Sequence, residues 1–154
     1  MTEQVIRFYE TGGPEVLKVE SQALAAPGPG EVRVGHRAVG LNFIDTYHRS
    51  GLYPVPLPSG LGLEASGVVE AVGEGVTRIA VGDRVAFGSG ALGAYASSSL
   101  RSEAQLLPIP QGVSDEAAAA IMLKGMTAAY LLTQTRRSEE HTSELQSPMY
   151  LVCR

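Results

Sequence analysis

Short runs in which apolar and polar side chains alternate fill the first forty residues of the chain. Val5–Tyr9 alternates and ends at a Thr-Gly-Gly-Pro turn, and Val16–Glu20 alternates again, which predicts a two-stranded hairpin. A longer, valine-bearing strand is predicted over Glu31–Leu41. Short strands at close spacing with glycine and proline turns between them indicate a barrel or a sandwich.

Further strands are predicted beyond residue 60. Gly67–Val72 is a compact β-branched run, and Val81–Phe87 is a turn that leads into another strand. Gly93–Ser99 is predicted to pair with that strand. The β-rich part then ends at Gln105–Ile109, where prolines begin to punctuate the sequence.

The hydrophobic period changes after Ser114. This serine is a plausible N-cap, acidic residues follow it in the first turn, and the alanine-rich run Ala117–Met122 favours a helix. Lys124-Gly125 is predicted to interrupt that helix, and Met126–Thr135 is predicted to begin a second one.

Polar and aromatic side chains gather just past the predicted Glu31–Leu41 strand. A short helix is predicted over Asn42–Arg49, and the segment from residue 42 to residue 53 supplies Asn42, Asp45, Tyr47, His48 and Tyr53. A loop or short helix at a strand end can hold such side chains over a cleft. The segment is therefore the main candidate for a functional site.

Composition narrows the class of protein. The 154 residues are 44% hydrophobic and 18% charged, which is typical of a single globular domain and predicts a cytoplasmic protein with no membrane span or secretory signal. A net charge of −4 without a basic cluster disfavours nucleic-acid binding. Because Cys153 is the only cysteine, neither a disulfide framework nor a thiolate metal cage is expected.

Two glycine-rich stretches match the glycine spacing of a dinucleotide-binding fingerprint. Residues 88–93 match GxGxxG, and residues 60–65 match the variant that ends in alanine. The fingerprint requires a helix directly after the glycines, so that the helix N-terminus meets the pyrophosphate. Strand-like sequence follows both stretches, so we interpret both as turns and expect no nucleotide-binding Rossmann domain in this chain.

Two stretches together carry a family resemblance: AVGLNFIDTYHRSGLY at residues 38–53 and LPSGLGLEASG at residues 57–67. From about Ile6 to about Thr135 the chain resembles the zinc-independent quinone oxidoreductases, relatives of zeta-crystallin in the medium-chain dehydrogenase/reductase superfamily. The resemblance implies a mainly β fold with short helices, a partly open barrel like the co-chaperonin GroES. It also implies that a Rossmann domain should follow and is missing here.

The same resemblance bears on metal binding. Zinc-dependent members of the superfamily have a Gly-His-Glu motif and a cysteine near the position of Asn42, whereas this chain has Gly62-Leu63-Glu64 and Asn42-Phe43. Leucine cannot ligate a metal, so no zinc is expected. We interpret His36 and His48 as surface or structural residues.

The resemblance further implies a reaction in which NADPH reduces a quinone, in a full-length homo-oligomer, expected to be a dimer. It places Asn42, Phe43, Asp45 and Tyr47 at the nicotinamide and Tyr53 in the same cleft. It also places Lys124 and Thr127 near the cofactor. Structural roles remain open for each: Asp45 as a helix cap, the tyrosines as half-buried core, Lys124 as a solvated helix end, and Glu64 as a buried hydrogen-bonding residue.

The expected organisation is a GroES-like substrate domain at residues 1–124, the start of a helix leading to the absent Rossmann domain at 125–136, and a non-native tail at 137–154. The string RSEEHTSELQS is polar all round, as a solvated tail would be, and it also resembles a translated sequencing-library adapter. In the second case the native sequence ends near Arg136, and His141 and Cys153 carry no function.

Three functions remain open at this point. The chain is either an inactive fragment of a quinone oxidoreductase, a standalone GroES-like binding or assembly module, or a protein with a secondary nucleic-acid-binding role. The third is disfavoured by the acidic balance. A fragment would also leave apolar helix residues uncovered near residues 121–132, which predicts poor solubility or association.

Overall fold

The structure is a computed structural model that describes residues 2–135. Residues 1–123 form one compact unit, and a second unit begins at Lys124. The two are described separately below. The expectations for the tail at residues 137–154, including His141 and Cys153, lie outside the described residues.

The first sheet has three strands in the order β2-β1-β4. Strands β1 (Thr2–Phe8) and β2 (Lys18–Ala23) pair antiparallel, which confirms the predicted hairpin, and β4 is the two-residue strand Ser59–Gly60. A single 3₁₀ turn, η1 (Pro14–Val16), lies in the hairpin connection, so β2 begins two residues later than the alternation indicated. Phe8, Val16 and Leu61 form a small apolar cluster beneath this sheet.

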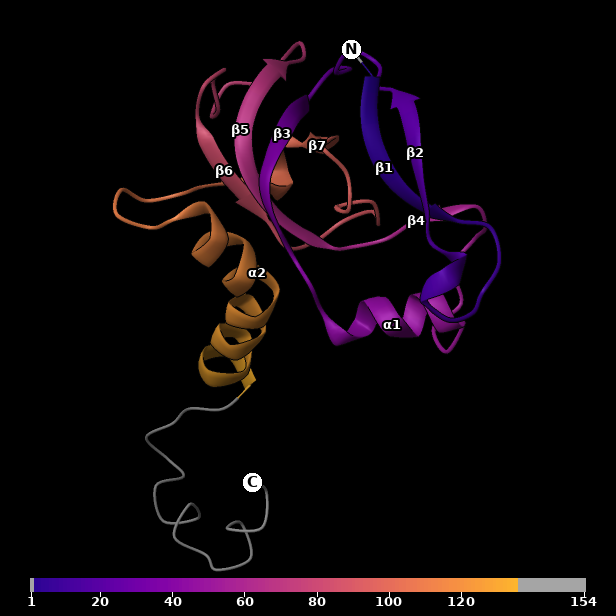
Figure 1. The fold of residues 1–154 in the computed structure, drawn as a ribbon. Helices are drawn as coiled ribbons and strands as arrows, with labels where there is room; N and C mark the ends of the chain where they lie inside the picture. Colours follow the sequence, from indigo (N-terminus) through magenta and orange to yellow (C-terminus); the bar gives the residue numbers. More distant parts are fainter. Residues whose placement is uncertain (1, 136–154) are drawn as a thin grey trace, which may run out of the picture. The chain divides into compact units, whose positions relative to one another are not determined.

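The second sheet has five strands in the order β7-β3-β5-β6-β8, and every neighbouring pair is antiparallel. Its members are β3 (Glu31–Gly40), β5 (Glu64–Val72), β6 (Arg84–Phe87), β7 (Ser98–Ser102) and β8 (Leu107–Pro108). The main core lies against it and comprises Val32, Val34, Ala65, Val69, Ile79, Val85, Phe87, Ala94 and Leu106. Figure 1 shows β3, β5 and β6 as neighbouring strands on one side and the β1–β2 hairpin on the other. The mainly β, GroES-like prediction is confirmed.

One pairing prediction is wrong. Residues 93–97 lie outside any named strand, and β7 pairs with β3 instead of β6. The segment between β6 and β7 turns toward the other sheet, where the backbone N–H of Ile6 donates to Tyr95 O at 2.8 Å and that of Ser97 donates to Gln4 O at 2.8 Å. Proximity in sequence does not enforce a hairpin across a connection of this length. The segment joins the two sheets.

Helix α2 (Asp115–Tyr130) is continuous, and a π-helical turn, η3 (Leu131–Thr135), follows it. The predicted break at Lys124-Gly125 is therefore wrong. An interior glycine costs only about 1 kcal/mol relative to alanine, and the alanines on both sides offset that cost. The backbone N–H of Ala117 donates to Ser114 Oγ at 3.1 Å, which confirms the predicted N-cap.

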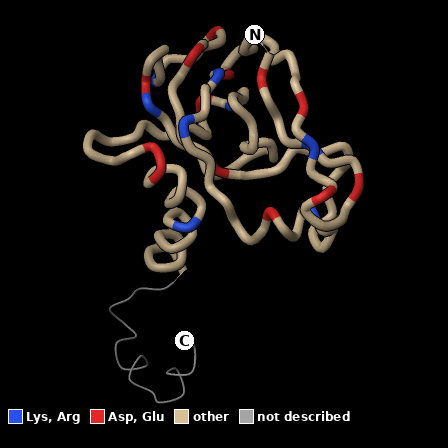
Figure 2. Tube along the Cα trace, viewed as in Figure 1, with Lys and Arg blue, Asp and Glu red and all other residues tan. Residues whose placement is uncertain are grey.

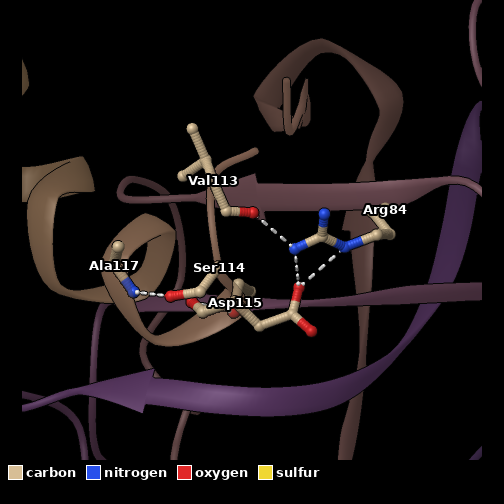
Figure 3. A network of polar contacts seen from close by, with 6 residues as sticks. Arg84, Val113, Ser114, Asp115 and Ala117 are labelled. Carbon is tan, nitrogen blue, oxygen red and sulfur yellow. Dashed lines mark hydrogen bonds and ion pairs between the residues drawn. The ribbon is translucent and has the colours of Figure 1, made fainter. Parts of the chain in front are cut away.

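An ion pair fixes the start of α2 on the second sheet. Arg84 Nη2 lies 2.7 Å from Asp115 Oδ1 and 2.8 Å from the Val113 carbonyl oxygen, so one guanidinium holds both the first turn and the approach to it (Figure 3). None of the helices described in residues 2–135 is long and apolar enough to cross a membrane. Lysines and arginines are scattered among acidic residues along the trace in Figure 2, without a basic cluster in the described part.

Candidate functional site on helix α1

The short helix predicted after the third strand is present as α1 (Phe43–Ser50), directly after β3. Asn42 is its N-cap, and the backbone N–H of Asn42 donates to Asp45 Oδ2 at 2.9 Å. Gly51 ends the helix with φ +84°, a conformation that glycine adopts without strain. The open question about Asp45 is thereby answered in part, because its carboxylate does act at the helix start.

Two of the predicted site residues are buried at this helix start. Asn42 is 7% exposed and Asp45 is 2% exposed. Asn42 Nδ2 donates to Glu64 Oε1 at 2.7 Å, and the Tyr95 hydroxyl donates to Asp45 Oδ2 at 2.8 Å. Burial, together with the bond to Asp45, raises the pKa of Tyr95 above its ordinary value, so its hydroxyl stays a proton donor.

Tyr95 was missed in the sequence because it lies in a loop that carries no period. The glycine of Gly62-Leu63-Glu64 offers a structural reason for its position: Gly62 has φ +90°, and a Cβ there would overlap the Tyr95 ring. Glu64, at the other end of the motif, is completely buried. The two ends of this motif therefore support the start of α1, one through Tyr95 and the other through Asn42.

Glu64 also reaches helix α2. The backbone N–H of Leu123 donates to Glu64 Oε2 at 2.7 Å. Gly40 lies directly opposite Glu64 in the β3–β5 register, and a Cβ on Gly40 would overlap the glutamate side chain. The structure thus gives Glu64 the buried hydrogen-bonding role that the sequence left open.

The aromatic residues of the predicted site stack beside the buried polar group. The ring centroids of Phe43 and Tyr47 lie 5.6 Å apart, and those of Tyr47 and Tyr53 lie 5.3 Å apart, both in edge-to-face geometry. Phe43 is 76% exposed and Tyr53 is 49% exposed. We call this row of three rings the aromatic edge. It offers an accessible apolar surface that the ring of a planar ligand can contact.

Hydrogen-bonding capacity remains unfilled next to the aromatic edge. Asp45 Oδ1 and His48 Nδ1 are buried, and neither has a hydrogen-bond partner among the described residues. His48 also lies 6.2 Å from Tyr53, between ring centroids. A buried polar atom without a partner raises the free energy of the folded state. A hydrogen bond with a polar ligand group would therefore be most favourable at these two atoms.

Lys124 and Thr127 lie on α2, three residues apart and exposed, in the second unit. Residues at this spacing share a helix face. Asn42, Phe43, Asp45, Tyr47 and Tyr53 are brought together within the first unit, whereas the roles given to Lys124 and Thr127 stay predictions.

A second, half-buried polar network surrounds His36, which belongs to no predicted site. His36 Nδ1 lies 2.8 Å from the Ala96 carbonyl oxygen, and Nε2 lies 2.9 Å from Ser99 Oγ, which in turn accepts from Arg101 Nε at 3.1 Å. Because a carbonyl only accepts, we assign the proton to Nδ1. Burial lowers the pKa of His36 to about 4 and that of Arg101 to about 10. The structural interpretation of His36 therefore agrees with its environment.

Neither glycine-rich stretch precedes a helix. Residues 88–93 form a loop after β6, and residues 60–65 run from β4 into β5, as the turn interpretation predicted. Among the residues that the structure describes, no group of three or more histidine, cysteine, aspartate or glutamate side chains is placed to hold a metal ion.

An apolar groove of about 580 Å³ opens elsewhere on the first unit. Its walls include Val5 and Val19 from the hairpin, Val39 and Leu41 at the end of β3, and the Tyr95 ring. Asn42, Asp45, Tyr47 and Tyr53 do not line it. The groove is therefore a separate feature that touches the site only through Tyr95.

Comparison with known proteins gives a consistent result. Residues 28–137 match the family model of the alcohol dehydrogenase GroES-like domain. A quinone oxidoreductase from Pseudomonas aeruginosa is 60% identical over 131 residues, which are 84% of this chain and 40% of the relative.

Solved structures agree. A quinone oxidoreductase from Pseudomonas syringae superimposes with a TM-score of 0.84 at 57% identity, over 89% of this chain and 42% of the other. The Escherichia coli quinone oxidoreductase complexed with NADPH gives a TM-score of 0.84 at 49% identity, over 87% and 41%. The chain thus spans about two fifths of the length of the proteins that it matches. It belongs to the alcohol dehydrogenase GroES-like domain family of the medium-chain dehydrogenase/reductase superfamily, and it matches the N-terminal part of quinone oxidoreductases.

Proposed function

We propose that this chain is the substrate-side part of an NADPH-dependent quinone oxidoreductase. The observation that carries the proposal is the aromatic edge, formed by two rings of α1 and by Tyr53 after it, together with buried hydrogen-bonding atoms of α1 that have no partner among the described residues. A quinone and a nicotinamide are both flat rings with polar substituents, so they need an accessible apolar face together with a few placed polar groups. The names of the relatives support the same reaction.

The residues near α1 fit the nicotinamide end of this cofactor. Phe43 and Tyr47 would contact its ring, Asp45 Oδ1 would accept from a carboxamide N–H, and Asn42 would help to orient that group. Tyr53 would contact the quinone, and Lys124 and Thr127 would lie toward the cofactor. When bound, NADPH supplies the hydride, and these residues bind and orient the two reactants.

We propose zinc-free chemistry for this site. Where zinc-dependent members of the superfamily have a histidine, this chain has Leu63, which cannot ligate a metal. The Asn42 amide nitrogen donates to Glu64. The donor set therefore does not fit zinc, and polarisation of the quinone would fall to hydrogen-bond donors.

We further propose that the 154-residue chain is inactive by itself. Both glycine-rich stretches lack the helix that a pyrophosphate-binding turn needs, and the chain spans only about 40% of its relatives. The described residues thus form no binding turn for the pyrophosphate of a dinucleotide.

A chimera tests this proposal. Residues 1–130 of this chain are joined to the corresponding downstream part of the Pseudomonas aeruginosa relative, and NADPH oxidation is followed with and without a quinone. We expect quinone-dependent oxidation by the chimera and none above background by the 154-residue chain. A folded chimera without activity would contradict the assigned reaction, and turnover by the chain alone would contradict its assigned inactivity.

A further inference from the structure

A single buried carboxylate connects the start of α1 to the middle of α2. Glu64 is fully buried, and each of its oxygens serves a different element: Oε1 accepts from Asn42 Nδ2 and Oε2 accepts from the Leu123 N–H, both at 2.7 Å. Hydrogen bonds to an ionised group are stronger and more directional than neutral ones. Asn42 and Leu123 are therefore linked through one side chain within the first unit.

The cost of this arrangement suggests that its geometry matters. A buried charge gains little stability over an apolar residue of similar size, because desolvation offsets its hydrogen bonds. The sheet also gives up a side chain at Gly40, where a Cβ would overlap Glu64. A leucine at position 64 would occupy a similar volume without burying a charge.

Leu123 is an unusual place for such a contact. In a regular helix its N–H would donate to the Ala119 carbonyl, four residues earlier. The Leu123 N–H also lies within hydrogen-bonding distance of Glu64 Oε2, so a carboxylate from the sheet meets the backbone of α2 at this turn. Side-chain insertion into the ladder is a recognised cause of helix bending. The next two residues, Lys124 and Gly125, include a poor helix former.

We propose that Glu64 is a positioning residue that couples helix α2 to Asn42. Movement of α2 at Leu123 shifts the Glu64 carboxylate, and the carboxylate turns the Asn42 carboxamide. The functional consequence rests on the proposed function: a change at Leu123 would reach Asn42, the residue proposed to help orient the nicotinamide.

Hydrogen exchange on the 154-residue chain, measured by NMR without any cofactor, tests the coupling. Four versions are compared: the unmodified chain, Asn42→Ala, Glu64→Gln, and the double variant. Glutamine matches the shape of glutamate but replaces one acceptor oxygen by an NH2 donor, so one of the two N–H groups would face a donor instead of an acceptor. Exchange at the Leu123 amide is expressed relative to that at Val69, whose N–H is bonded to Asp83 O inside the main core and reports global opening.

We expect Glu64→Gln to speed relative exchange at Leu123 by about tenfold, since a charge-assisted bond is lost. Asn42→Ala should change relative exchange at Leu123 by about threefold or more in the unmodified background. It should leave that exchange unchanged in the Glu64→Gln background, which is the result that a double-mutant cycle gives for coupled residues. Glu70→Gln is the matched control, because Glu70 is an exposed glutamate on the same strand, and it should have no effect at Leu123.

The coupling is overturned if Asn42→Ala leaves Leu123 unchanged, or changes it equally in both backgrounds. If Glu64→Gln fails to fold, the comparison of Asn42→Ala with the unmodified chain still tests the coupling, because it measures exchange at Leu123 directly. Exchange at Leu123 in the unmodified chain that is as fast as at the exposed Ala128 amide would also overturn it. None of these measurements needs the chain to bind a dinucleotide, so their failure is distinct from failure of the proposed reaction.

Discussion

The Tyr95 hydroxyl donates to Asp45 across fifty residues of sequence, with 2.8 Å between the tyrosine oxygen and Oδ2. The same oxygen of Asp45 accepts from the Asn42 N–H that begins helix α1. The loop between β6 and β7 therefore helps to fix the helix that carries the candidate site.

Removing this hydroxyl should destabilise the fold. Tyr95→Phe leaves a buried carboxylate short of one donor, which costs about 1–3 kcal/mol. Urea denaturation would measure the loss. Tyr9→Phe is the matched control, because the Tyr9 hydroxyl bonds Glu20 on the exposed surface and should matter by less than about 0.5 kcal/mol. Equal effects of the two variants would contradict a special role for Tyr95.

Gly40→Ala should also destabilise the chain, although the glycine does not have a positive φ. The added methyl group overlaps the buried Glu64 side chain, and overpacking of this kind costs about 1–3 kcal/mol. Gly28→Ala serves as the control, because its nearest neighbour is the flexible Glu31 side chain at 3.2 Å. If Gly40→Ala were as mild as Gly28→Ala in thermal unfolding, Glu64 would not be tightly held.

The His36 network predicts a pH dependence of stability. Burial lowers the His36 pKa from the ordinary 6.5 to about 4, so as the pH falls the unfolded chain takes up this proton first. The contribution of His36 to the free energy of unfolding is complete above its ordinary pKa of 6.5. It is lost as the pH falls from 6.5 to about 4, by about 3 kcal/mol in total.

Urea unfolding at several pH values between 7 and 4 measures this slope. His36→Asn, which keeps a donor near the Nδ1 position, should flatten the slope. An unchanged slope in His36→Asn would assign the acid sensitivity to other groups.

Association of the chain is expected through the apolar end of its helical segment. Ile121, Tyr130, Leu131 and Leu132 are each more than half exposed, and exposed apolar side chains in this number favour self-association. Light scattering should show oligomers whose mass falls with dilution, and Leu131→Ser/Leu132→Ser should shift the chain toward monomer. A monodisperse monomer at high concentration would contradict this expectation.

The sequence predicted local features of the site well and its long-range contacts poorly. The N-cap role of Ser114 and the short helix after β3 follow from residues close in sequence, and both are confirmed. Tyr95 could not be found in this way, because its partner lies fifty residues away and its loop has no hydrophobic period. The pairing of β7 with β3 was missed for a similar reason.

Helix α2 shows the opposite error. The sequence pattern predicted that Gly125 interrupts the helix, but the alanine-rich residues around it sustain the helix. The role of Gly62 could not be predicted from the sequence either. The motif Gly62-Leu63-Glu64 indicates a family, but only the three-dimensional structure shows that its glycine makes room for Tyr95 and that its glutamate holds Asn42.

The central claim is that helix α1 carries the residues that receive the nicotinamide and the quinone. The most direct measurement is steady-state quinone reduction by the active chimera and its Asn42→Ala, Tyr47→Ala and Tyr9→Ala variants, each first shown to be folded by circular dichroism. We predict that Asn42→Ala and Tyr47→Ala lower kcat/KM by about tenfold or more, equivalent to about 1.4 kcal/mol, and that Tyr9→Ala changes it by less than about twofold. Folded Asn42→Ala and Tyr47→Ala chimeras with undiminished kcat/KM would contradict the claim.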